Sequence, residues 1–302
     1  SVILFPVLLD LFLWLGPRLS VNRLLATLGE EFSFLARENI APAAEIKRIQ
    51  DSLALLIDLD VNLFSLLRTF PIGISSLISQ ALPSETPLGV PDIQYLENAF
   101  VLIFWIFVLT LVGWVLGSIY FTWVAKVSLK QDGQDLLWAG KTILQSFLLS
   151  IVWTIAIFIL GTPLLIVFSI FAQINQSLAQ LALVFLALFA MWVVVPFFFS
   201  AHGIFTRREN LFRSIMGSFR LSRYTLPTSS FFVLGVLLLS QGFNSLWLVP
   251  SSASWMMLVG IIGHAFITTA LLAASFVYYR DMFDWLEVLF EKLDSKVTSA
   301  QA

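Results

Sequence analysis

The sequence predicts an all-α protein: a polytopic integral membrane helical bundle with about six transmembrane helices, an outer amphipathic insert and inner interfacial elbow helices. Of its 302 residues, 59% are hydrophobic, and the mean hydropathy is +0.91. Charged residues make up 12%, about half the share of an ordinary soluble domain. A water-soluble core could not enclose this much apolar surface, so we expect a lipid bilayer to solvate much of it.

The composition and motifs also exclude several classes of function. A net charge of −2 argues against a nucleic-acid partner. The absence of cysteine excludes disulfides, thiolate zinc sites and cysteine-held iron–sulfur clusters. Residues 139–142 end like a phosphate-binding loop, but Asp135 stands where the first glycine belongs. We therefore predict no cofactor, no metal site and no catalytic residue, and hence a protein that is not an enzyme.

Six apolar stretches reach or approach the roughly 20 residues that a spanning helix needs. They cover residues 1–16, 99–125, 142–174, 178–200, 229–248 and 254–279. The first is short and begins with Ser1 inside an apolar run, so we expect that upstream residues are missing. Gly161-Thr162-Pro163 predicts a kink in the third. The predicted organisation is a first transmembrane helix (1–16), an extracytoplasmic segment (17–97), a five-helix membrane domain (98–280) and a cytoplasmic amphipathic tail (281–302).

The distribution of basic residues predicts the orientation in the membrane. The connection between the fourth and fifth spans carries a group that we expect to form an inner basic interfacial helix: Arg207, Arg208, Arg213, Arg220 and Arg223. Lys126, Lys130 and Lys141 lie in or beside the connection between the second and third spans. Because basic loops face the cytoplasm, both termini are predicted to be cytoplasmic, in the cytoplasmic (plasma) membrane.

The outer segment, residues 17–97, carries six basic and ten acidic residues. Pro42 predicts the start of a helix that runs to about Phe70. Its apolar residues recur at helical spacing at Ile46, Ile49, Leu53, Leu56, Ile57, Leu63, Phe64 and Leu67. A short amphipathic piece from Ile74 to Leu82 follows. Either these helices cover the outer ends of the bundle, or residues 42–82 form a docking surface for a protein partner or the membrane interface.

The second half repeats a pattern of span, inner amphipathic elbow and return span. The elbows are expected at residues 134–145, 209–224 and 281–293, and each mixes large apolar residues with flanking charges. Helices of this kind lie at the membrane interface with one face in the acyl boundary. Membrane lipids are therefore predicted partners of the chain.

Three motifs in residues 197–281 carry a resemblance to a known group. They are Glu209-Asn210-Leu211-Phe212-Arg213-Ser214, Ser218-Phe219-Arg220-Leu221-Ser222-Arg223 and Tyr278-Tyr279-Arg280-Asp281. The stretch resembles bacterial polytopic inner-membrane proteins of unknown function, including the membrane domain attached to some glycerophosphodiester phosphodiesterases. The resemblance implies six spans and no established chemistry. The long outer insert is a departure from the group, and the phosphodiesterase activity is not carried over.

Two ionisable residues inside predicted spans, Asp10 and His264, are candidates for function, because charge in a bilayer is costly. At similar depth they form a candidate intramembrane polar pair that relays a proton. The alternative interpretation is structural: Asp10 reaches the interface near Arg18 or accepts a hydrogen bond from a neighbouring helix, and His264 bonds a hydroxyl such as that of Thr268. His202, beside the basic connection, is interpreted as an interfacial residue.

Polar residues on two spans predict contacts between helices. Gln241, Asn244 and Ser245 share a face of the fifth span, and Gln145, Ser146 and Ser150 share a face of the third. Interhelical hydrogen bonds explain such faces, and a polar substrate path is the alternative. The function predicted is a non-enzymatic scaffold, assembly or regulatory subunit acting with a membrane or protein partner; the alternative is a small-solute or lipid transporter.

Overall fold

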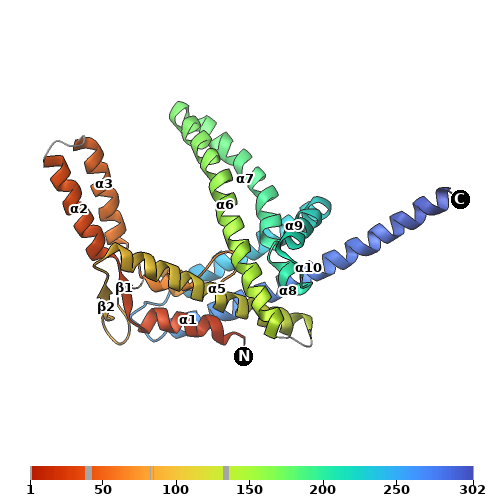
Figure 1. Cartoon of the computed structure of the whole chain (residues 1–302), viewed down its shortest axis with the longest axis horizontal. Helices are drawn as coiled ribbons and strands as arrows, with labels where there is room; N and C mark the ends of the chain where they lie inside the picture. The colour runs from red at the N-terminus through yellow and green to blue at the C-terminus, as the bar shows by residue number, and fades with distance from the viewer. Residues whose placement is uncertain (1, 38–42, 82, 84, 132–135, 302) are drawn as a thin grey trace. The chain divides into compact units, whose positions relative to one another are not determined.

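The computed structural model describes residues 2–37, 43–81, 83, 85–131 and 136–301 (Figure 1). Across these ranges the chain forms ten α-helices, one 3-10 helix and two three-residue strands, which confirms the all-α prediction. The chain divides into two compact units. Unit 1 holds Ser1–Thr69, Gly73–Gly117 and Gly242–Thr268, and unit 2 holds Phe70–Ile72, Ser118–Gln241 and Thr269–Ala302. Helices α5, α9 and α10 contribute residues to both units.

Four helices of the described ranges are long and apolar enough to cross a membrane. They are α5 (Ala99–Leu129), α6 (Leu136–Ile174), α9 (Leu211–Trp247) and α10 (Met257–Gln301). At about 1.5 Å per residue, each exceeds the roughly 30 Å of a bilayer's hydrocarbon core. The other two predicted spans are also helical, as α1 (Leu4–Leu15, 12 residues) and α7 (Gln176–Phe199, 24 residues). Six spans therefore remain a prediction.

In unit 1, two parallel strands pair the beginning of the predicted outer segment with its end. Strand β1 (Arg18–Ser20) pairs with β2 (Ile93–Tyr95), in register from Arg18 opposite Ile93 to Ser20 opposite Tyr95. Between the strands lie α2 (Asn22–Arg37), α3 (Ala43–Asp58), the 3-10 helix η1 (Leu63–Leu67) and α4 (Ile78–Ala81). Neither the two strands nor α2 is among the elements predicted from the sequence.

The helix predicted from Pro42 to Phe70 is wrong in its second half, because α3 ends at Asp58. Asn62 then starts η1, its side-chain oxygen accepting a hydrogen bond from the Phe64 backbone N–H at 3.1 Å. Helices α2 and α3 form a helical hairpin (Figure 1). Of the predicted apolar stripe, Ile46 is buried and Leu53 lies beside Gly29 of α2, whereas Leu56 is exposed. Gln50 of α3 donates to Ser33 of α2 at 2.6 Å, beside that contact.

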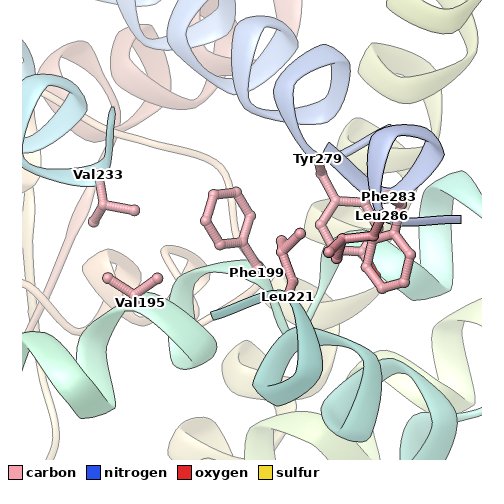
Figure 2. Packing of buried hydrophobic residues seen from close by; sticks show 7 residues of the cluster. All are labelled: Val195, Phe199, Leu221, Val233, Tyr279, Phe283 and Leu286. Carbon is pink, nitrogen blue, oxygen red and sulfur yellow. The ribbon is translucent and has the colours of Figure 1, made fainter. Parts of the chain in front are cut away.

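In unit 2, α6 and α7 form a second hairpin (Figure 1). Asn175 joins them and caps α7, its side chain accepting from the Ser177 N–H at 2.7 Å. The short helix α8 (His202–Thr206) follows α7. A buried cluster joins α7, α9 and α10 (Figure 2). It consists of Val195, Phe199, Leu221, Val233, Tyr279, Phe283 and Leu286. This cluster fixes the start of α9 against the middle of α10.

The elbows differ from the sequence prediction at two of three places. The described part of the first elbow belongs to α6, and the third is part of α10, so neither is a separate helix. In α9 the backbone does leave the helical region, at Thr225 (φ −124°, ψ 18°), next to the predicted elbow end. The Thr225 hydroxyl bonds the Leu221 carbonyl at 2.7 Å and Pro227 lacks an N–H, and both weaken a helix. By contrast, α6 continues through Pro163, where a kink was expected.

Candidate functional site

Asp10, on α1, is completely buried and holds the start of α4. Its carboxylate accepts hydrogen bonds from the Ser76 hydroxyl and from the backbone N–H groups of Leu77 and Ile78, the latter two at 3.1 Å each. Ser76 is itself fully buried. A carboxylate favours the first N–H groups of a helix, because these have no partner within the helix. Asp10 therefore ties α1 to the loop that precedes α4.

Arg68 supplies the opposite charge for this carboxylate. Its Nη1 donates to the Ser79 hydroxyl at 3.2 Å, and its guanidinium lies close enough to Asp10 for an electrostatic interaction. Burial lowers the pKa of Arg68, and the neighbouring carboxylate raises it in part. A guanidinium still keeps its charge at neutral pH. Arg68 is not among the residues predicted from the sequence, because it lies outside every predicted span.

His264, on α10, is buried against the end of α9. Its Nδ1 lies 2.8 Å from the side-chain oxygen of Asn244, whose amide nitrogen donates to the Gln80 side-chain oxygen at 3.4 Å. This arrangement makes Nδ1 the donor and leaves a lone pair on Nε2, which has no hydrogen-bond partner among the described residues. The Thr268 hydroxyl bonds the His264 backbone carbonyl at 2.8 Å, and not the ring as the sequence analysis considered.

No hydrogen bond joins Asp10 and His264 in the part of the chain that the structure describes, and the contacts of Asp10 fit the structural alternative, while the proton relay stays a prediction. Both side chains are buried, as expected, but their hydrogen bonds go elsewhere. Each reaches the same short stretch, residues 76–80, from a different side: Asp10 at its start, and His264 through Asn244 at its end. We call this set the polar cluster, and it comprises Asp10, Arg68, Ser76, Gln80, Asn244 and His264. Fixed hydrogen bonds occupy the carboxylate, so the arrangement suits a structural tie between α1, α4, α9 and α10.

A double-mutant cycle checks the assignment of partners within the cluster. We expect His264→Leu and Asn244→Leu each to destabilise the protein by about 1–3 kcal/mol, because each leaves a buried polar group unpaired. The double variant should be milder than the sum, because neither partner remains. A parallel cycle between Asp10→Asn and His264→Leu should be nearly additive. Thermal unfolding in detergent provides the measurement, and the reverse pattern would restore the direct pair.

In unit 2, Arg207 joins the start of α9 to α10. Its guanidinium bonds Glu287 at 2.7 Å and Glu209 at 3.2 Å, and it lies 4.8 Å from the centre of the Phe283 ring. Burial raises the pKa of Glu209, and the adjacent Arg207 offsets part of that effect. The lack of a side chain at Gly203 makes room for this carboxylate, since a Cβ there would lie 2.7 Å from Glu209 Oε2. Arg207 is thus a packing residue as well as a basic one.

The other predicted basic residues fall into two groups. Arg208 adopts a left-handed backbone conformation (φ 56°) in the turn before α9. Arg213, Arg220 and Arg223 are exposed on α9, where Arg220 lies over the Phe290 ring at 4.4 Å. The N-terminal part of α9 therefore has a basic exposed side, and Arg207 and Arg208 belong to the turn that precedes it.

His202, interpreted from the sequence as an interfacial residue, is buried among helices of unit 2. It is 3% exposed, and its Nε2 lies 2.8 Å from the Ser275 hydroxyl of α10. Its ring packs beside those of Phe198, Phe276 and Tyr279. Two of these aromatic neighbours, Phe276 and Tyr279, come from α10, more than 70 positions away in the sequence.

Some of the residues that carry the sequence resemblance are buried in unit 2, whereas others in the same motifs, such as Phe212 and Arg213, are exposed. The Ser214 hydroxyl donates to the Ser200 carbonyl at 2.6 Å, and Leu221 and Tyr279 belong to the cluster in Figure 2. Their place in the fold is thus the packing of α9 on α7 and α10. Among the described residues, no three His, Cys, Asp or Glu side chains gather as metal ligands would. Comparisons with protein-family models, curated proteins and solved structures found no match for this chain.

Proposed function

We propose that this chain is a non-enzymatic integral protein of the cytoplasmic membrane, with about six spans and both termini in the cytoplasm. In this proposal it serves as a scaffold, assembly or regulatory subunit and binds a protein partner through its outer segment. Four helices able to cross a membrane support the first part. The observation that carries the second part is the exposed apolar surface of the α2–α3 hairpin.

Several large apolar side chains of the hairpin are exposed, as is Leu59, the residue after α3. Their exposed fractions lie between 42% and 66% for Leu28, Phe34, Leu55, Leu56 and Leu59. Leaving such side chains in water forgoes about 25 cal/mol for each Å² that a partner would bury. Apolar surface of this kind marks interaction sites. The hairpin therefore presents exposed apolar side chains to a partner, which a hairpin that only covered the ends of the bundle would not need.

A fixed base holds the hairpin in place. Arg18 of β1 is buried and bonds Asp60 at 3.2 Å, and Asn22 at the start of α2 donates to Asp60 at 2.9 Å. The Leu19 N–H donates to the Asn62 side-chain oxygen at 3.1 Å. These bonds tie both ends of the hairpin to the same strand pair. A surface presented on a fixed base loses little conformational entropy on binding, which favours docking.

The charge of the outer segment favours a protein over a lipid surface as the partner. Residues 17–97 hold ten acidic against six basic residues. Amphipathic helices that bind membranes instead carry Lys and Arg on their polar face, because lipid surfaces are anionic. The matching partner is a protein whose apolar groove is bordered by basic residues.

Site-specific photo-crosslinking in native membranes tests this function. A photoreactive amino acid at position 55 or 34 should form an adduct with one protein at near-stoichiometric yield, because these side chains face the partner. The same amino acid at position 54, which is exposed about 100° around α3 from Leu55 and about 160° from Leu56, serves as the control. The adduct should disappear when Leu28 and Leu56 are changed to Ser. Adducts with lipids alone, or equal yields at all three positions, would contradict the proposal.

A further inference from the structure

The N-terminal part of α9, residues 211–224, turns its hydroxyl side inward and its aromatic side outward. Ser214, Ser218 and Ser222 are buried on the same side as Leu221. On the opposite side, Phe212 is 80% and Met216 64% exposed, and Phe219 is also exposed. This is the reverse of a helix that packs in water, where the large apolar side chains face inward.

Three arginines border these apolar side chains. A helix turns by about 100° per residue, so Phe212, Met216 and Phe219 lie within an arc of about 60°. By the same spacing Arg223 falls inside this arc, and Arg213 and Arg220 lie together about 50° beyond Met216. We call the six residues the α9 strip. The strip thus combines an apolar centre with a basic edge on one exposed side.

The arginines of the strip differ from those elsewhere in unit 2. Arg207 pairs with Glu209 and Glu287, and Arg280 pairs with Asp281 at 2.8 Å. Within the ranges that the structure describes, Arg213, Arg220 and Arg223 make no such ion pair. Arg213 lies close enough to Glu209 to lower the pKa of that carboxyl, but all three arginines are exposed and can reach an anionic group from outside the chain.

The position of the strip along α9 matches the level of lipid headgroups. From residue 226 to Trp247, the helix has 22 residues, about 33 Å, which is sufficient to cross the hydrocarbon core. Residues 211–224 then lie beyond the core, and the break at Thr225 allows them to run in another direction. An interfacial helix buries its apolar side at the acyl boundary and holds its basic residues at the headgroups.

We propose that the α9 strip binds anionic phospholipids. The guanidinium groups of Arg213, Arg220 and Arg223 contact headgroup phosphates, which arginine recognises through paired N–H donors. Phe212, Met216 and Phe219 contact the first part of the acyl chains. The inference rests on the proposed membrane insertion, and the proposed topology places the strip in the cytoplasmic leaflet, whose surface is negatively charged. The bound lipid holds residues 211–224 at the membrane surface, next to the break at Thr225 that separates them from the rest of α9.

Native mass spectrometry of the full chain, titrated in detergent with phosphatidylglycerol or phosphatidylcholine, tests the lipid preference. The wild type should bind phosphatidylglycerol more tightly. The triple variant Arg213→Gln/Arg220→Gln/Arg223→Gln should bind it roughly tenfold or more weakly, because each surface arginine contributes up to about fivefold. Arg280→Gln also removes a positive charge, but from a paired residue, and should keep wild-type affinity. Equal affinity for both lipids, or equal losses in the triple and Arg280→Gln variants, would overturn the inference.

A depth measurement separates this inference from the proposed function on which it rests. The chain has no cysteine, so a nitroxide at Met216→Cys reports from one position. In vesicles with three parts phosphatidylcholine to one part phosphatidylglycerol, it should be more accessible to oxygen than to a water-soluble nickel reagent. A label at Glu291→Cys, on the exposed tail, should show the reverse. A water-exposed label at 216 in a chain that resists alkaline extraction refutes the lipid-binding strip alone; release of the chain by alkali refutes membrane insertion as well.

Discussion

Asp10→Leu is expected to destabilise the protein by about 3–5 kcal/mol. The substitution keeps a large side chain but removes the acceptor of three buried donors, the Ser76 hydroxyl and the N–H groups of Leu77 and Ile78. Each buried donor left unpaired costs about 1–3 kcal/mol, and Arg68 loses its opposite charge. Asp10→Asn keeps one oxygen but places an N–H₂ group among donors, so we expect about half the loss. Thermal and denaturant unfolding in detergent measure both variants.

Asp51 on α3 provides the matched control, because its carboxylate is exposed. Asp51→Leu and Asp51→Asn should stay within about 0.5 kcal/mol of the wild type. Hydrogen exchange adds a local signal: the backbone N–H groups of Leu77 and Ile78 should exchange faster in Asp10→Leu. Unchanged stability together with unchanged exchange at these two positions would show that Asp10 does not hold the start of α4.

The second large effect is expected where α10 passes the end of α9 in unit 1. A Cβ added at Gly260 would overlap the backbone carbonyl oxygen of Trp247, and one added at Gly263 would lie 2.7 Å from two carbons of the Trp247 ring. Overpacking of this kind costs about 1–3 kcal/mol. Gly260→Ala should therefore lower stability by about 2 kcal/mol, although alanine is the better helix former.

Gly242 on α9 is the control for this comparison, because a Cβ there would meet nothing within 4 Å. Gly242→Ala should be neutral or stabilise the protein by up to about 1 kcal/mol through helix propensity. The two clashes can also be told apart. Trp247→Ala should relieve the cost of Gly263→Ala, where the obstacle is a side chain, but not that of Gly260→Ala, where it is backbone. Equal effects of Gly242→Ala and Gly260→Ala would refute the close contact.

The sequence predicted the apolar helices well, because their signal is local. A run of apolar residues long enough to span a bilayer sets the positions of α5, α6, α9 and α10 without knowledge of their neighbours. The buried state of Asp10 and His264 followed from the same local reasoning. Asn244, expected to bond another helix, does so through His264. This interhelical bond was predicted from the position of Asn244 on a polar face of the helix.

The partners of these residues could not be predicted, because they depend on contacts between distant positions. Asp10 bonds residues 66 to 68 positions away, in a segment expected to lie outside the bundle. Strands β1 and β2 have three residues each, too few to show an alternating pattern. In α2, Leu24, Leu28, Phe32 and Leu35 recur at helical spacing, so the sequence did carry a signal for this helix that was overlooked. The burial of His202 could not be predicted for the same reason as the partners of Asp10, since part of its aromatic surroundings comes from α10.

The sidedness of two single-cysteine variants tests the proposed topology, in which the basic residues of the α9 strip are cytoplasmic and the outer segment is not. Leu55→Cys lies on the α2–α3 hairpin and Arg213→Cys on the strip, and no other cysteine competes. In right-side-out vesicles, a membrane-impermeant maleimide should label position 55 immediately, and position 213 only after the vesicles are opened. Labelling of both positions from the outside, or of position 213 alone, would contradict the account.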